Sequence, residues 1–175
     1  MCGPGPLGPW ARMVLPLVVL DKTIDIQAPP QAVFSLLTRV AQSPRWLPGT
    51  VRATRDGGGA AGPPAAVEAL HQGSRVHTVV DAAGMRLQSA QELVAFRENA
   101  LFGWRQHAGD FARHEGAYSL VPTPGGGTRL RLRMEVELPF VLPVFLTEAE
   151  VHHLFSSRMD RALMNLKDLA EGAAS

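Results

Sequence analysis

The strongest constraint on the fold is a stretch of strict alternation between residues 128 and 138. Apolar residues occupy every second position of this stretch, namely Leu130, Leu132, Met134, Val136 and Leu138. Charged residues occupy the positions between them, namely Arg129, Arg131, Arg133, Glu135 and Glu137. A strand with this pattern has one dry face and one wet face. The preceding run GAYSLV and the turn PTPGGG make residues 116–139 a hairpin, and something must cover its dry face.

A long amphipathic helix is expected directly after this hairpin. Thr147 and Glu150 have the spacing of a capping box, which predicts that the helix begins there. Apolar residues then recur three and four positions apart from Val151 to Leu169, and Gly172 can end the helix. The helix has roughly 25 residues and a length of ~37 Å, with one apolar stripe that a sheet must receive.

The segments before the hairpin predict an α+β fold. A strand is expected at 18–28, followed by a short amphipathic helix at 29–40, a second helical turn or two at 41–49, and a strand at 51–55. From Ser74 onward, alternation bounded by turn residues predicts five neighbouring antiparallel strands within 74–82, 85–96, 101–107, 111–121 and 128–138. The helices would then lie on one face of an antiparallel sheet.

The length of 175 residues suits one domain, which we place at 17–172. Residues 1–16 are rich in Gly and Pro and are expected to form a flexible leader, with Met13 as an alternative start. The tract DGGGAAGPPAA at 56–66 is expected to be a loop.

Several classes of function are disfavoured by composition. The 17 basic and 16 acidic side chains give a net charge of +1 without a basic block, so no nucleic-acid partner is expected. No apolar run approaches the ~20 residues of a membrane span, and MVLPLVVL lacks the features of an export signal. The single Cys2 and the scattered histidines predict neither a disulfide framework nor a metal site, and no cofactor motif is found. We expect a cytoplasmic protein.

The sequence resembles the helix-grip or START-like superfamily over residues 18–171. The resemblance rests on IDIQAPPQAVFSLLTRVAQSPRWLPGTV, GSRVHTVVDAAGMRLQSAQELVAF, AYSLVPTPGGGTRLRL and RALMNLKDLAE. It is similar in particular to the polyketide cyclase/dehydrase and coenzyme-Q-binding-like branch. The resemblance implies a curved sheet of about seven strands around a long C-terminal helix, with two short helices after the first strand and an elongated hydrophobic cavity. Members bind lipids, sterols, quinones or aromatic polyketides, and some are enzymes, so the fold alone does not choose among these functions.

His114 and Tyr118 are the candidate catalytic residues. They share one face of their strand, where they could orient or protonate a carbonyl-bearing ligand at a pocket wall. The alternative places both on the convex, solvent-facing side of the sheet, because a shift of one residue reverses the faces. The enzyme class would then be a cyclase or dehydratase acting on a polyketide-like chain.

The expected ligand-binding residues come from the inward faces of the strands and the long helix. They are Trp104, Tyr118, Leu132, Met134, Phe155 and Met159. Trp104 could stack on a flat ligand, with Gln106 on the same face, or simply belong to the core.

The segment PFVLPVFL at 139–146 offers a further surface. It could form a lid, touch a membrane transiently through Phe140 to Leu146, dock another protein, or pack in the core. The main hypothesis remains a cavity between sheet and helix that binds a hydrophobic or aromatic small molecule, such as a lipid, quinone or polyketide. The alternatives are the enzyme and a protein-interaction module of the coenzyme-Q-binding-like type.

Overall fold

The structure, a computed structural model, describes residues 17–56, 70–82, 84–138 and 147–172. Three expectations concern residues outside these ranges. They are the leader at 1–16 with the alternative start at Met13, all but the first residue of the 56–66 loop, and the apolar segment from Phe140 to Leu146.

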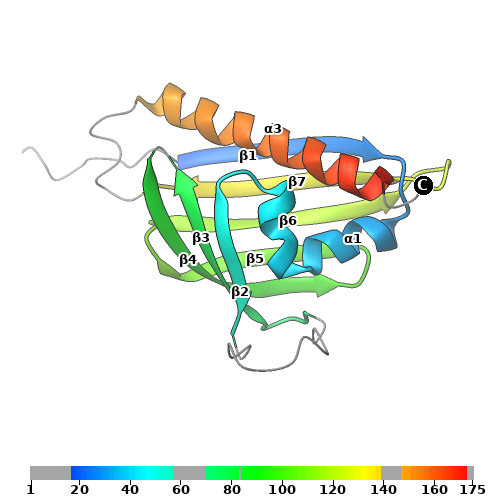
Figure 1. The fold of residues 1–175 in the computed structure, drawn as a ribbon, viewed down its shortest axis with the longest axis horizontal. Helices are drawn as coiled ribbons and strands as arrows, with labels where there is room; N and C mark the ends of the chain where they lie inside the picture. The colour runs from blue at the N-terminus through cyan, green and yellow to red at the C-terminus, as the bar shows by residue number, and fades with distance from the viewer. Residues whose placement is uncertain (1–16, 57–69, 83, 139–146, 173–175) are drawn as a thin grey trace, which may run out of the picture.

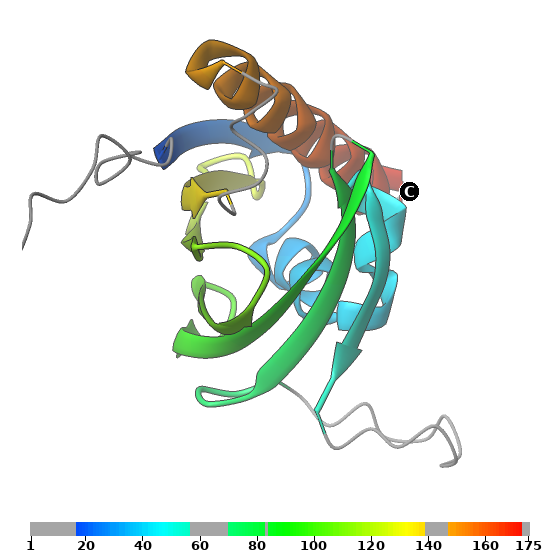
Figure 2. The same ribbon diagram turned by 90° about the vertical axis from the view of Figure 1, so that its left-hand side faces the viewer.

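Seven antiparallel strands form one sheet in the order β1-β7-β6-β5-β4-β3-β2. Their bounds are β1 Leu17–Ile26, β2 Thr50–Arg55, β3 Arg75–Ala82, β4 Met85–Arg97, β5 Leu101–Gly109, β6 Arg113–Pro122 and β7 Thr128–Glu137. The sheet curls around its concave side, where the helices lie (Figures 1 and 2). The expected α+β helix-grip fold is therefore confirmed.

The strand β1 closes one side of the sheet by pairing with β7. The register runs without a break from Leu17 opposite Glu137 to Ile26 opposite Thr128. On the outer face, Arg129 Nε donates to Asp25 Oδ1 at 2.8 Å and Arg131 Nε donates to Asp21 Oδ1 at 2.8 Å. Arg129 and Arg131 therefore belong to a solvent-facing side of the sheet, where carboxylates of the neighbouring strand compensate their charge.

Two bulges interrupt the pairing of the long strand β4 with β5. The register shifts between Ala90 and Gln91 and again between Leu93 and Ala95. Because each extra residue bends a strand and increases its twist, these bulges help the sheet to curve at its centre.

The short helices follow β1. They are α1 at Pro30–Thr38, the 3-10 turn η1 at Val40–Gln42 and α2 at Ser43–Trp46. Pro30 occupies the first turn of α1, where its missing N–H is not needed, and Val33, Phe34 and Leu37 form the buried face. Both α1 and α2 contact α3, so these helices occupy the concave side together (Figure 2).

The helix α3, Glu148–Gly172, is the long element that the sheet grips. The capping box is present: Glu150 N donates to Thr147 Oγ1 at 3.2 Å, and Thr147 N donates to Glu150 Oε2 at 2.7 Å. The helix also covers the free edge of β1. Lys167 Nζ donates to the Asp25 carbonyl at 2.7 Å, and Gln27 N donates to Glu171 Oε1 at 2.7 Å.

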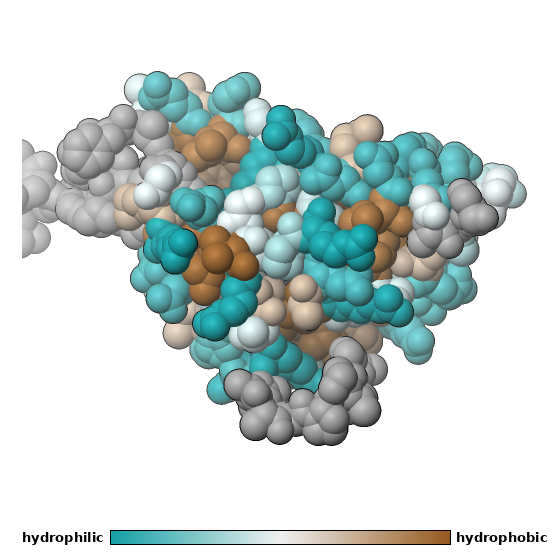
Figure 3. Space-filling model, viewed as in Figure 1, coloured by the Kyte–Doolittle hydropathy of each residue, from teal (hydrophilic) through white to brown (hydrophobic). Residues whose placement is uncertain are grey.

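The main core joins the inner faces of the strands to α1 and α3. Apolar patches on the surface over α3 and β2 are separated by polar side chains (Figure 3). Leu154, Met164 and Val51 are among the exposed large apolar residues of these elements. Within the described ranges, no helix has the length and apolar character needed to cross a membrane.

Candidate functional site

A mostly apolar cavity lies between the concave face of the sheet and the helices. Its volume is about 110 Å³. The wall includes side chains from α1, α2, five of the strands and α3. Trp46 of α2, Phe155 and Met159 of α3, and Val80 of β3 are among its apolar members. A cavity of this size holds about one aromatic ring, since engineered cavities of ~150 Å³ bind benzene.

Aromatic rings form one side of the wall. Trp104 and Tyr118 lie with ring centroids 5.3 Å apart, and Trp46 meets Tyr118 edge-on at 6.2 Å. Phe102 continues the cluster at 6.2 Å from Trp104. Such a surface suits a flat or aromatic guest, because tilted and edge-to-face ring contacts add to the effect of apolar burial.

A hydrogen-bonded polar network enters this apolar wall at His114. Gln106 Nε2 donates to the Phe111 carbonyl at 2.7 Å, and the Ser89 hydroxyl donates to Gln106 Oε1 at 2.8 Å. Gln91 Nε2 lies 3.2 Å from His114 Nδ1 and Ser89 Oγ lies 3.3 Å from it.

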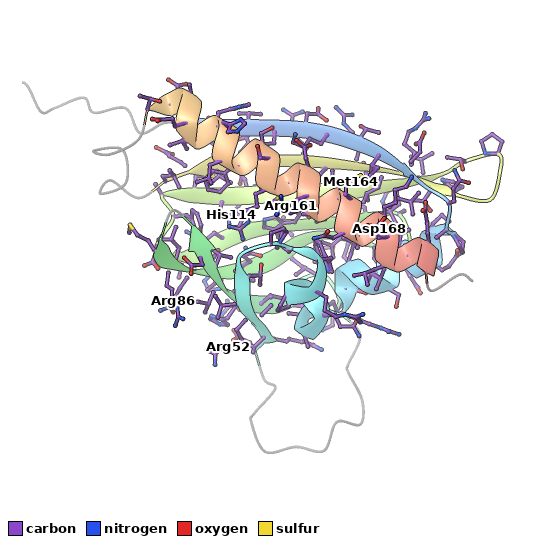
Figure 4. The ribbon with its side chains drawn as sticks, turned by 45° about the horizontal axis from the view of Figure 1, so that its top comes forward. Arg52, Arg86, His114, Arg161, Met164 and Asp168 are labelled. Atoms are coloured by element: carbon purple, nitrogen blue, oxygen red, sulfur yellow. The ribbon has the colours of Figure 1, made fainter. Side chains whose placement is uncertain are left out.

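Two groups contact Nδ1 of His114. Nδ1 accepts from the Gln91 amide when the ring proton lies on Nε2, and it donates to Ser89 Oγ when the ring proton lies on Nδ1. Within the described part of the chain, Nε2 has no hydrogen-bond partner, so it donates to a guest in the first tautomer and accepts from a guest in the second. Figure 4 shows His114 between α3 and the sheet.

Burial keeps both candidate catalytic residues neutral. Desolvation, followed by the charge of Arg158, lowers the pKa of His114 to about 4. Desolvation alone raises the pKa of Tyr118 above its usual value. At neutral pH both side chains are therefore hydrogen-bonding groups without charge.

Arg158 of α3 is the charged residue among the described residues of the wall. Its side chain is half-buried, and Nη1 reaches the Asp81 carbonyl at 3.5 Å. Its Nε is buried and finds no acceptor in the described part of the protein, and the same is true of the indole N–H groups of Trp46 and Trp104. Desolvation lowers the pKa of Arg158, while the Asp81 carboxylate acts in the opposite direction. Among the described residues, three wall side chains thus hold a buried N–H donor without an acceptor.

The structure brings most of the sequence-predicted site residues together. Trp104, Tyr118, Met134, Phe155 and Met159 line the cavity, and His114 lines it as well. His114 and Tyr118 therefore lie on the concave side, not on the convex side that the alternative required. Leu132 shares the inward face of β7 but is fully buried in the core and is not part of the wall.

Sequence reasoning missed Arg158 and the polar residues of β4 as site residues. The spacing of residues along α3 and β4 could have indicated Arg158 and Gln91 as site residues. Arg158 follows Phe155 by three positions on α3, and Gln91 is two positions from both Ser89 and Leu93 on β4. The register shift beside Gln91 hid its neighbours on β5, because a bulge leaves no clear mark in the sequence.

Metal binding finds no support in the described residues, which contain no group of three or more His, Cys, Asp or Glu side chains able to hold an ion. The predicted absence of a metal site rests on residue spacing alone.

Comparisons with known proteins agree with this geometry. A family model described as polyketide cyclase / dehydrase and lipid transport matches residues 18–171. No curated protein gives a significant match. Among solved structures, protein TTHA0849 of Thermus thermophilus is similar, with a TM-score of 0.70 and 24% identity over 91% of this chain and 100% of that one.

Two further structures share the fold. A START superfamily protein of Mycobacterium smegmatis has a TM-score of 0.68 at 18% identity, covering 89% of this chain and 98% of its own. The Zhui aromatase/cyclase of Streptomyces sp. R1128 has a TM-score of 0.60 at 18% identity, covering 90% of this chain and 93% of its own. At these identities the similarity concerns the fold.

Proposed function

The chain belongs to the polyketide cyclase / dehydrase and lipid transport family, and we propose on this premise that it binds a hydrophobic or aromatic small molecule between the sheet and α3. The observation that carries the proposal is the cavity of about 110 Å³ with its wall of aromatic and aliphatic side chains. Burial of a guest there contributes roughly 25 cal/mol per Å² of apolar surface, before the costs of association. A guest larger than one ring requires the wall to move.

Adjacent residues of β3 provide a matched test. Val80 lines the cavity, whereas Val79 does not, because neighbouring residues of a strand point to opposite faces. The neutral compound trans-cinnamamide, which has one ring, should bind the wild type in a calorimetric titration. Val80→Phe fills the cavity and should weaken binding by about tenfold or more, while Val79→Phe should leave it unchanged.

Equal binding of trans-cinnamamide by both variants would place the compound on the surface and remove the support for a binding cavity. Native mass spectrometry of the purified protein provides an independent measurement, because a retained natural guest adds its mass to the folded chain.

A cyclase or dehydratase activity is the second candidate, and the observation that favours it is the neutral His114 in the cavity wall, whose Nε2 has no partner among the described residues. His114 and Tyr118 could both donate to a carbonyl oxygen of a poly-β-ketone guest. The test is incubation with a β-polyketone thioester, followed by mass spectrometry for loss of water. Turnover that disappears in His114→Gln and Tyr118→Phe supports an enzyme, and no turnover by the wild type argues for a carrier.

A further inference from the structure

We propose that the guest of this cavity carries an acidic oxygen group, such as a carboxylate, and that Arg158 binds it. The inference rests on the proposed function and names the chemical class of the ligand. It follows from the charges and hydrogen-bond donors of the wall.

The first observation is an uncompensated positive charge. Arg158 lines the cavity, and in the described part of the chain no carboxylate lies within ion-pair distance of its guanidinium. None of the described wall residues is Asp or Glu. Asp81 influences Arg158 through its field, but its own side chain is exposed to solvent and forms no ion pair with Arg158. His114 adds no charge because it is neutral, so the described wall residues together bear one positive charge.

The second observation is an excess of donors. A guanidinium has five N–H donors, and within the described ranges only Nη1 of Arg158 reaches an acceptor, at the long distance of 3.5 Å. Its Nε is buried and has no partner among these residues, and the same holds for the indole N–H groups of Trp46 and Trp104. Buried donors without acceptors are rare in folded proteins, because each one loses its hydrogen bond to water.

A carboxylate at Arg158 compensates the positive charge and supplies acceptors to the guanidinium. It offers up to four acceptor sites and can receive two parallel N–H bonds from one guanidinium. The backbone near Arg158 also restricts where its guanidinium can move. A Cβ added at Gly49 would lie 3.2 Å from Arg158 Cζ, so the chain at Gly49 packs directly against the guanidinium. The acid group is thus expected at α3, with the apolar body of the guest among the aromatic rings.

The test uses two compounds that differ in charge but hardly in size, trans-cinnamate and trans-cinnamamide, each with one ring. Calorimetric titration of the wild type should show cinnamate binding at least about tenfold more tightly than cinnamamide, as expected for a charge-assisted bond. Arg158→Gln should abolish this preference while keeping cinnamamide affinity. Arg158→Lys should restore part of it, because lysine keeps the charge but not the two parallel bonds.

Arg161→Gln is the matched control, because Arg161 lies on the same helix, is exposed, and is not part of the wall (Figure 4). Its preference for cinnamate should equal that of the wild type. Equal affinities of the wild type for both compounds, or a preference that survives Arg158→Gln, would overturn the acidic-ligand proposal and leave cavity binding standing. Failure of both compounds to bind the wild type would overturn cavity binding and this proposal together.

Discussion

At the scale of single residues, Gly116 determines how the aromatic wall is placed. It pairs with Trp104 across β5 and β6, and a Cβ added at Gly116 would lie 2.7 Å from Trp104 Cζ2 and 2.7 Å from the Arg133 carbonyl. The missing side chain therefore makes room for the indole beside the cavity.

Gly116→Ala should lower the free energy of unfolding by about 1–3 kcal/mol, because the added methyl group displaces Trp104 or the backbone of β7. Gly125→Ala is the control, since a Cβ at Gly125 meets nothing within 4 Å. Urea unfolding with tryptophan fluorescence measures both. Equal stability of the two variants would show that Trp104 moves away without cost.

His114 makes the stability depend on pH in a defined window. The pKa is about 4 in the folded protein, compared with 6.5 for an ordinary histidine. Above pH 6.5 the ring is neutral in both states. As the pH falls from 6.5 through 4, the unfolded chain takes up the proton first, so the free energy of unfolding falls, by at most about 3 kcal/mol.

The His114→Gln variant should lose less stability than the wild type over this range, because glutamine cannot be protonated. Urea midpoints from pH 7 to about pH 4 measure the difference. His107→Gln, at an exposed position of β5, serves as the control and should follow the wild type. Parallel pH curves for the wild type and His114→Gln would show that His114 is freely hydrated.

At the scale of elements, α3 depends on its first turn for a defined start. Thr147 and Glu150 satisfy each other's backbone N–H groups there. Thr147→Ala removes one of these bonds and should cost about 1 kcal/mol of stability. Ser157→Ala, at an exposed site in the same helix, should cost much less. Chemical unfolding of the two variants provides the comparison, and equal losses would mean that the cap contributes nothing.

The sequence predicted the elements well because their periods are strong. The alternation of β7 and the capping box of α3 are both found where expected. Charged side chains on the exposed face of β7 bond to carboxylates of β1, as expected for a face in contact with solvent. The boundaries of the weaker elements differ by a residue or two. The predicted first strand runs to residue 28, but β1 ends at Ile26, where its pairing with Thr128 ends.

The site was less predictable than the elements. Alternation placed His114 and Tyr118 on one face, yet it could not say which face was concave, because one residue of register reverses the answer. Leu132 and Met134 share the inward face of β7, but only Met134 reaches the cavity. Whether an inward side chain reaches the cavity depends on the curvature of the sheet, and no local sequence pattern predicts this curvature.

At the scale of the whole molecule, a guest that binds only the folded chain must stabilise it. A ligand at a hundred times its dissociation constant contributes about 2.7 kcal/mol, which for a chain of this size raises the unfolding midpoint by roughly 5–10 °C. The one-ring compound trans-cinnamamide should therefore raise the midpoint of the wild type and of Val79→Phe. A similar rise for Val80→Phe, measured by scanning calorimetry, would place the binding outside the cavity.

The pairing of β1 with β7 has a consequence for biosynthesis. Asp21 and Arg131, which meet across these strands, are 110 residues apart in the chain. At roughly 5–20 residues per second, the ribosome needs about 5–20 seconds to deliver the partner of the first strand. During that delay Val18, Leu20 and Ile26 lack the surface that finally buries them, so the nascent chain offers chaperones an early and long-lasting binding site.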